Sequence, residues 1–243
     1  MTAFPSSSAT ALATPPTAAV PPDWLTFAPP PPGFTERFRV LPDVLPRSAF
    51  DTLAAEIEQF IGTERNYVPT HKKGGTIAYE TLRARAPRIA AFYQSLALRR
   101  YVSDIVGIDV EPTPLHDQSS LSVLFYERPG DHIGWHYDHN FYKGRHFTVL
   151  LPIVNRGATG SHLSAARLMV RKGRDETIVE TPPDTLIVFE GARVLHKVTP
   201  IEAGERRIVL SMTFCADNRH SMLQEAMRRI KDTAFFGPRA LWS

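Results

Sequence analysis

Seven short apolar runs follow one another along the second half of the chain. Each run is rich in Val, Ile, Leu or Phe, and Gly, Pro or Asp residues separate most of them. In chain order they read "SLSVLFYE", "HFTVLLPIV", "ARLMVRK", "ETIVET", "TLIVFEG", "VLHKVTP" and "RRIVLSMTF". Short strands at such close spacing are typical of a β-barrel or of a jelly roll made of two sheets. We therefore expect a mainly β fold with flanking helices, in which residues of about 115–215 form a jelly-roll core.

Two helices are expected before this core, within a supporting helical region of about 47–106. The segment "SAFDTLAAEIEQFI", Ser48–Ile61, places its apolar residues on one helical face, and Gly62 is a suitable stop. Apolar positions at helical spacing also predict a helix over about 88–106. Helical spacing returns after the β runs and predicts a C-terminal helix over about 217–231.

Residues 1–33 differ in composition from the rest of the chain. They consist mainly of Pro, Ala, Ser and Thr and end in "APPPPG". Such a segment buries too little apolar surface to offset the entropy lost on ordering, so we expect a flexible or extended arm. Trp24, Leu25 and Phe27 either dock this arm on the domain or belong to an unattached tail. We expect residues 34–243 to form a single domain.

Composition narrows the cellular setting and the partners. The 28 basic and 25 acidic residues give a formal charge of +3, too mild an excess to indicate nucleic-acid binding. Cys215 is the only cysteine, which excludes an internal disulfide and favours a reducing compartment. No apolar run is long enough to span a membrane, and the first 36 residues contain no Lys or Arg, unlike secretory or transit peptides. We expect a cytoplasmic protein without nucleic-acid or membrane partners.

His136 and Asp138 stand two residues apart in "HIGWHYD". Because side chains alternate faces along a strand, both would point to the same side and could bind one metal ion. His196, after a tight turn in "VFEGARVLHKVTP", is the expected third ligand. Two histidines and a carboxylate leave three positions of an octahedron open, which suits non-haem Fe(II) and oxygen chemistry. Taken alone, the pair is also compatible with a hydrated turn, and His196 with a core histidine.

Arg206 follows His196 by ten residues, beyond a turn at Gly204. The returning strand would bring a guanidinium into the same cavity, where it could hold a carboxylate in a bidentate pair. Arg207 is the rival. Strand alternation puts it on the opposite face from Arg206, so only one of the two can enter the cavity.

Three longer stretches carry a resemblance to a known family: "YERPGDHIGWHYD", "RHFTVLLPIVN" and "TPPDTLIVFEGARVLHKVTPIEAGERRIVLSMTF". Together, over about 119–214, they resemble the catalytic core of the Fe(II)/2-oxoglutarate-dependent oxygenases. The texture is closest to the prolyl-4-hydroxylase-like branch, near the enzymes that hydroxylate or halogenate free amino acids. The resemblance implies a double-stranded β-helix, the cupin-like form of the jelly roll.

The resemblance also implies roles for individual residues. His136, Asp138 and His196 match the iron ligands, and the family spacing selects Arg206 as the partner of the distal carboxylate of 2-oxoglutarate. Tyr126 and Thr148 stand where the family often places further hydrogen-bond donors to that co-substrate. The expected cofactors are Fe(II), 2-oxoglutarate as co-substrate and O2, with ascorbate as the reductant in vitro.

Asp138 bears on the type of reaction. The resemblance implies that relatives which halogenate carbon have a small residue at this position, leaving room for chloride on the iron. A carboxylate predicts hydroxylation or another oxidation of an unactivated C–H bond instead.

Substrate contacts are expected from two regions. Residues 68–87 combine Gly-Gly with basic side chains and could form a lid or a solvated basic loop; within them, Lys72 or Lys73 could meet a substrate carboxylate. Thr213 resembles a substrate-contacting position of the relatives that act on free amino acids. The remaining candidates for substrate contacts are His132, Trp135 and His139.

A small polar metabolite, such as a free amino acid or a derivative, is the favoured substrate because no peptide-binding module is evident. A protein or peptide side-chain hydroxylase is the main alternative. A non-catalytic, cupin-like metal-binding module is the second. Nucleic-acid demethylation is disfavoured, because "RRIVLSM" lacks the R-x-N-x-T-x-R motif of those relatives.

Overall fold

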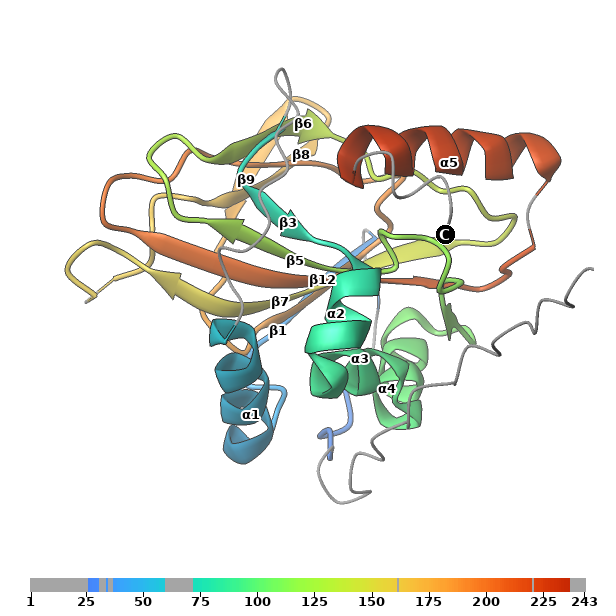
Figure 1. Cartoon of the computed structure of the whole chain (residues 1–243), viewed down its shortest axis with the longest axis horizontal. Coiled ribbons are helices and arrows are strands. Elements are labelled where there is room, and N and C mark those ends of the chain that lie inside the picture. Colours follow the sequence, from blue (N-terminus) through green and yellow to red (C-terminus); the bar gives the residue numbers. More distant parts are fainter. Residues whose placement is uncertain are drawn as a thin grey trace, which may run out of the picture.

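The computed structural model describes residues 26–30, 34, 37–59, 72–160, 162–219 and 221–236. Its core is two facing antiparallel sheets (Figure 1). The strands of the larger sheet run in the order β1 (Phe38–Leu41), β10 (Leu186–Phe189), β7 (His146–Arg156), β12 (Arg206–Cys215), β5 (Leu121–Tyr126) and β3 (Gly75–Ile77), and β4 (Glu111–Pro112) pairs with β12. Those of the smaller sheet run β2 (Lys72–Lys73), β6 (His132–His136), β11 (Leu195–Val198), β8 (Leu168–Lys172) and β9 (Asp175–Val179).

Helices cover the outer face of the larger sheet. Figure 1 shows α1 to α4 gathered on the side away from the smaller sheet, whereas α5 lies on the other side, beside the end of the smaller sheet. The helices are α1 (Arg47–Glu58), α2 (Tyr79–Arg85), α3 (Pro87–Gln94), α4 (Leu96–Val106) and α5 (Met222–Phe236). The prediction of a mainly β fold with flanking helices is confirmed.

The helix expected over 88–106 is two helices. Ser95 lies between α3 and α4 in an extended conformation, and its hydroxyl accepts a hydrogen bond from the Leu98 amide at 3.2 Å. This side-chain cap starts α4 as a separate helix, and Gly107 ends it in the left-handed region, with φ of 72°. The predicted boundary at Val106 is confirmed, but the break was missed.

The segment expected as a lid or basic loop contains regular structure. Residues 72–73 form β2 at the edge of the smaller sheet, residues 75–77 form β3 at the edge of the larger sheet, and α2 follows. This short stretch therefore joins both sheets at one edge. Residues 68–71 of the predicted lid lie outside the described residues.

Alternation along the long strand β12 separates two hydrophobic layers. Ile208, Leu210, Met212 and Phe214 pack in the cluster between the larger sheet and the helices. Val209, one position out of phase, packs in the second cluster, between the two sheets. The faces of β12 therefore divide a helix-side core from a sheet-side cavity.

Part of the predicted N-terminal arm is placed against the domain. The ring of Phe27 stacks on Tyr101 with 4.4 Å between centroids. Trp24 and Leu25 lie outside the described residues. Among the described residues, no helix combines the length and the hydropathy needed to cross a membrane.

Candidate metal centre

Three side chains that the sequence singled out meet between the sheets. His136 is the last residue of β6, and its backbone is paired in register with His196 on β11. Asp138 lies two residues beyond β6, with its Oδ1 at 3.5 Å from His136 Nε2 and 3.8 Å from His196 Nε2. One ligand atom from each residue lies within 4.8 Å of the others, so a single ion can bind all three.

Backbone carbonyls orient both imidazoles. His136 Nδ1 lies 2.9 Å from the Gly134 carbonyl oxygen, and His196 Nδ1 lies 3.0 Å from that of Val194. A proton on each Nδ1 satisfies these carbonyls and leaves the Nε2 lone pair facing the centre. Burial also lowers the pKa of His196, which favours the neutral ring that a metal needs.

Asp138 is held ionised in this setting. Burial opposes its charge, but positive charge on the neighbouring His196 and His136 rings and the hydrogen bond from the Thr148 hydroxyl more than offset that effect. The pKa of Asp138 is therefore held well below its ordinary value. A bound cation would supply the same positive charge in place of protons on the two rings. Despite burial, Asp138 also raises the pKa of His136, so this ring would lose its second proton on binding a cation. The three groups then form a donor set of two imidazoles and one carboxylate, which fits Fe(II) with positions left open.

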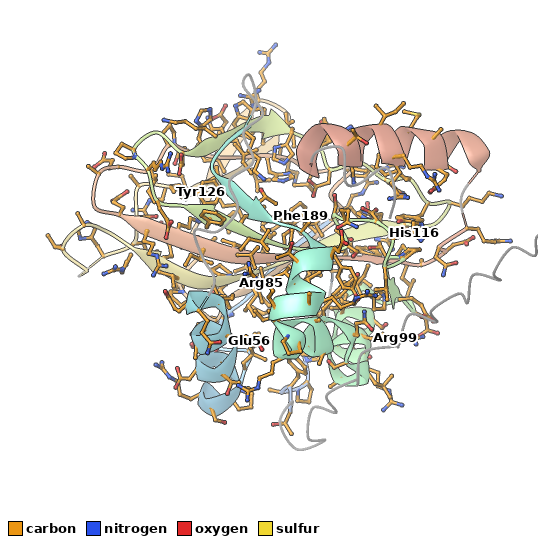
Figure 2. All side chains as sticks on the ribbon, viewed as in Figure 1. Glu56, Arg85, Arg99, His116, Tyr126 and Phe189 are labelled. Atoms are coloured by element: carbon orange, nitrogen blue, oxygen red, sulfur yellow. The ribbon has the colours of Figure 1, made fainter. Side chains whose placement is uncertain are left out.

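A small cavity of about 60 Å³ extends from the triad towards Arg207 and Tyr126. Both side chains are only 1% exposed, and the Arg207 Nε and Nη2 and the Tyr126 hydroxyl have no hydrogen-bond partner among the described residues. Figure 2 shows the labelled Tyr126 on the side of the larger sheet that faces the smaller sheet. A buried guanidinium without an anion is costly. The cavity therefore fits a ligand that binds the metal at one end and presents a carboxylate at the other.

A larger cavity of about 190 Å³ adjoins His136 and Asp138. His136, Asp138 and Thr148 line both cavities, so the two meet at the metal centre. Most other groups around the larger cavity are polar. They include Lys72 from β2, Ser211 and Thr213 from β12, and Lys231 from α5.

The comparisons with known proteins agree with this geometry. The model of a family described as HalD, Halogenase D, matches residues 34–160, more than half of the chain. The chain belongs to the Halogenase D family. No curated protein matches the sequence.

Solved structures similar to this Halogenase D family member are 2-oxoglutarate oxygenases. The epimerase SnoN from nogalamycin biosynthesis matches with a TM-score of 0.59 and 13% identity over 74% of this chain and 76% of SnoN. A Pseudomonas putida prolyl-4-hydroxylase matches with a TM-score of 0.53 and 21% identity, over 76% of this chain and 94% of the hydroxylase. A Trichoplax adhaerens prolyl hydroxylase in complex with a peptide matches with a TM-score of 0.52 and 15% identity, over 79% of this chain and 87% of the hydroxylase. Another SnoN structure contains Fe3+, alpha-ketoglutarate (2-oxoglutarate) and nogalamycin RO. The likeness confirms the predicted double-stranded β-helix.

Arg206 does not enter the cavity of this Halogenase D family member, and that prediction is wrong. Its Nε donates to Glu127 at 2.8 Å, and its Nη1 donates to both carboxylate oxygens of Glu58, on α1, at 2.6 and 2.9 Å. Arg206 shares its strand face with Ile208, which packs towards the helices. Arg207 occupies the opposite face and lines the small cavity.

Other predicted site residues do line the cavities. Tyr126 lies in the small cavity, and Thr148 lines both, with its hydroxyl donating to Asp138 Oδ2 at 2.5 Å. Lys72, His139 and Thr213 line the larger cavity.

Three predicted substrate residues lie outside both cavities. Trp135 neighbours His136 on β6 and so faces the other way, packed between Arg171 and Lys197 at 4.3 and 4.4 Å from its ring centre. Lys73 donates to the Pro129 carbonyl at 2.8 Å, and His132 Nδ1 lies 2.8 Å from that of Gly130. These contacts hold all three away from the centre.

Among the groups of the larger cavity that sequence reasoning missed are Lys231 and Ser211. Lys231 reaches it from the C-terminal helix, where its amine donates to Ser119 at 2.7 Å and pairs with Asp117 at 3.3 Å. Ser211 lines both cavities from β12. Only Ser211 had a sequence signal, since it lies an even number of residues from Thr213 and Arg207.

Proposed function

We propose that this chain is an Fe(II)- and 2-oxoglutarate-dependent oxygenase. The single observation that carries the proposal is the His136, Asp138 and His196 triad, which shares a small cavity with the buried guanidinium of Arg207, whose Nε and Nη2 have no hydrogen-bond partner in the described part of the chain. Two histidines and a carboxylate are the donor set of non-haem Fe(II) oxygenases. The bound iron and 2-oxoglutarate supply the oxidising power for attack on a C–H bond.

The protein groups have distinct parts in this proposal. The triad holds the metal, Arg207 pairs with the distal carboxylate of 2-oxoglutarate, and the Tyr126 hydroxyl donates a hydrogen bond to it. Thr148 serves Asp138 rather than the co-substrate. We assign the co-substrate to the small cavity and the substrate to the larger one, since both cavities are lined by His136 and Asp138. The enclosing sheets would limit the access of water.

Hydroxylation or another oxygen-based oxidation is proposed rather than halogenation, although the family carries the name Halogenase D. Asp138 Oδ1 lies near the Nε2 atoms of both histidines, at the proposed metal position. A halide on the metal would need the coordination position that this oxygen takes. A carboxylate ligand already fills that position.

The proposed substrate is a small polar metabolite with an anionic group, such as a free amino acid. Lys72 supports this choice because its amine lines the larger cavity, is buried, and has no carboxylate partner among the described residues. An incoming carboxylate would supply that partner. His139 and Thr213 are proposed to contact the same molecule. A peptide side chain remains the alternative substrate, since one of the similar structures holds a peptide.

The test is succinate formation by the purified protein with Fe(II), ascorbate, 2-oxoglutarate, O2 and a panel of free amino acids. We expect one class of amino acid to stimulate succinate formation, and we expect His136→Ala to abolish it. His132→Ala is the matched control, because this histidine lies on the same strand but outside both cavities.

Slow succinate formation that no amino acid stimulates would keep the oxygenase proposal and redirect the search to peptides. Metal binding without any 2-oxoglutarate turnover would replace it with a non-catalytic metal-binding module.

A further inference from the structure

The two oxygens of the Asp138 carboxylate have different neighbours. Oδ1 faces the Nε2 atoms of His136 and His196 at 3.5 and 3.8 Å. Oδ2 accepts a hydrogen bond of 2.5 Å from the Thr148 hydroxyl. The backbone amide of Asp138 is fixed as well, since it donates to the Gly191 carbonyl at 3.0 Å. One oxygen is thus directed at the metal position and the other is held by the protein.

Gly191 closes the far side of this arrangement. A Cβ atom at position 191 would lie 2.5 Å from Asp138 Oδ2 and 2.5 Å from the Thr148 hydroxyl oxygen, too close for either contact. The backbone of Gly191 is not in the left-handed region, so conformational strain does not require glycine there. The space taken by the carboxylate and the hydroxyl requires it.

Three distant parts of the chain build this contact. Asp138 follows β6, Thr148 lies on β7, and Gly191 follows β10. The β7–β10 register pairs Thr148 with Phe189, two residues before Gly191. Thr148 is buried, so water competes little for its hydrogen bond.

We propose that Thr148 and Gly191 are positioning residues that make Asp138 a one-oxygen ligand. The inference rests on the proposed metal centre. With Oδ2 held by a short, charge-assisted hydrogen bond, only Oδ1 is available to the ion. A carboxylate binding through both oxygens would take one of the positions that the co-substrate and O2 need.

The test is Co(II) binding to the metal-free protein, which calorimetry and the visible absorption of the cobalt site both measure. Thr148→Val should weaken Co(II) binding by about 10- to 100-fold, the usual effect of losing such a supporting contact. Thr148→Ser restores the hydroxyl and should stay within about threefold of wild type, since it retains the donor. Gly191→Ala should weaken binding at least as much as Thr148→Val.

Thr185→Val is the matched control. Thr185 is also buried, stands next to β10, and its hydroxyl has no partner among the described residues. Replacing Thr185 should leave Co(II) affinity unchanged. This result would separate the role of Thr148 from the general effect of replacing a buried threonine.

Asp138→Ala separates a failure of the proposed metal centre from a failure of the proposed positioning role of Thr148 and Gly191. If it leaves Co(II) affinity intact, the metal centre itself is wrong. If it weakens affinity while Thr148→Val and Gly191→Ala do not, the positioning role is overturned and the centre stands. In the Asp138→Ala background, Thr148→Val should have no further effect, because its target is gone.

Discussion

At the scale of single residues, the buried charge of Lys72 lowers the stability of the folded protein. Its amine is buried, and the partner that the structure gives it is the neutral hydroxyl of Thr76. Burial lowers the pKa of Lys72 from 10.5 to about 8. The amine is still charged at pH 7, and holding that charge without an anion costs the folded state stability. A binding role for the charge would account for this cost.

Lys72→Met should therefore stabilise the protein at pH 7, by up to about 3 kcal/mol from the size of the pKa shift. Because the folded-state pKa is lowered, the penalty is complete below about pH 8 and fades as the pH rises towards 10.5, so the gain should fade too. Denaturant unfolding at several pH values measures this gain, with Lys73→Met, at the neighbouring and only half-buried lysine, as control. Destabilisation by Lys72→Met at pH 7 would contradict this reading.

The three residues of the candidate metal centre could be predicted from the sequence, but the choice between two arginines could not be made from spacing alone. His136, Asp138 and His196 meet as expected. The arginine that lines the cavity follows His196 by eleven residues, not ten. The difference in polarity between the two faces of β12 could have decided between the two arginines. Arg207 shares its face with Thr213, a predicted substrate contact, whereas Arg206 shares its face with large apolar residues.

At the scale of elements, Glu56 links two helices. It is buried on α1, and its carboxylate oxygens accept hydrogen bonds from the backbone amides of Arg88 and Ile89 at 3.2 and 2.8 Å. These amides lie in the first turn of α3, which has no side-chain cap of its own. Glu56 thus satisfies orphan donors and complements the helix dipole.

Glu56→Ala should lower the free energy of unfolding by about 1–3 kcal/mol, since buried donors lose their partner. Glu58→Ala, two residues on, should cost less than about 1 kcal/mol, because its pair with Arg206 is partly exposed to solvent. Denaturant unfolding of both variants makes the comparison. Equal effects would show that the α3 amides do not depend on Glu56.

Sequence patterns located the long elements and missed the short ones. The seven apolar runs correspond to β5 and β7 to β12. The two- and three-residue β2, β3 and β4 carry too few residues for a pattern, and the four-residue β1 stands before the helices, apart from the series of apolar runs. Their strand conformation comes from backbone pairing with β10, β6, β5 and β12, which only the assembled sheets provide. The same holds for Lys231, which reaches the site only through the packing of α5.

At the scale of the whole molecule, the two sheets enclose a divided cavity with the metal position at the division. The smaller sheet contributes two histidines, and the larger sheet contributes Arg207, Tyr126 and the hydroxyl that holds Asp138. Neither sheet alone assembles the centre. Metal and co-substrate binding should therefore depend on the packing of one sheet against the other.

The most direct test compares adjacent arginines in 2-oxoglutarate binding. Without O2, Fe(II)-loaded wild type, Arg207→Gln and Arg206→Gln are titrated with 2-oxoglutarate, and Co(II) binding by each variant confirms an intact metal centre. Loss of a buried charge pair predicts binding about 30-fold weaker or worse in Arg207→Gln. Arg206→Gln, which loses only its pairs with Glu58 and Glu127, should bind as wild type does. Unchanged binding in Arg207→Gln, or a loss confined to Arg206→Gln, would contradict the account.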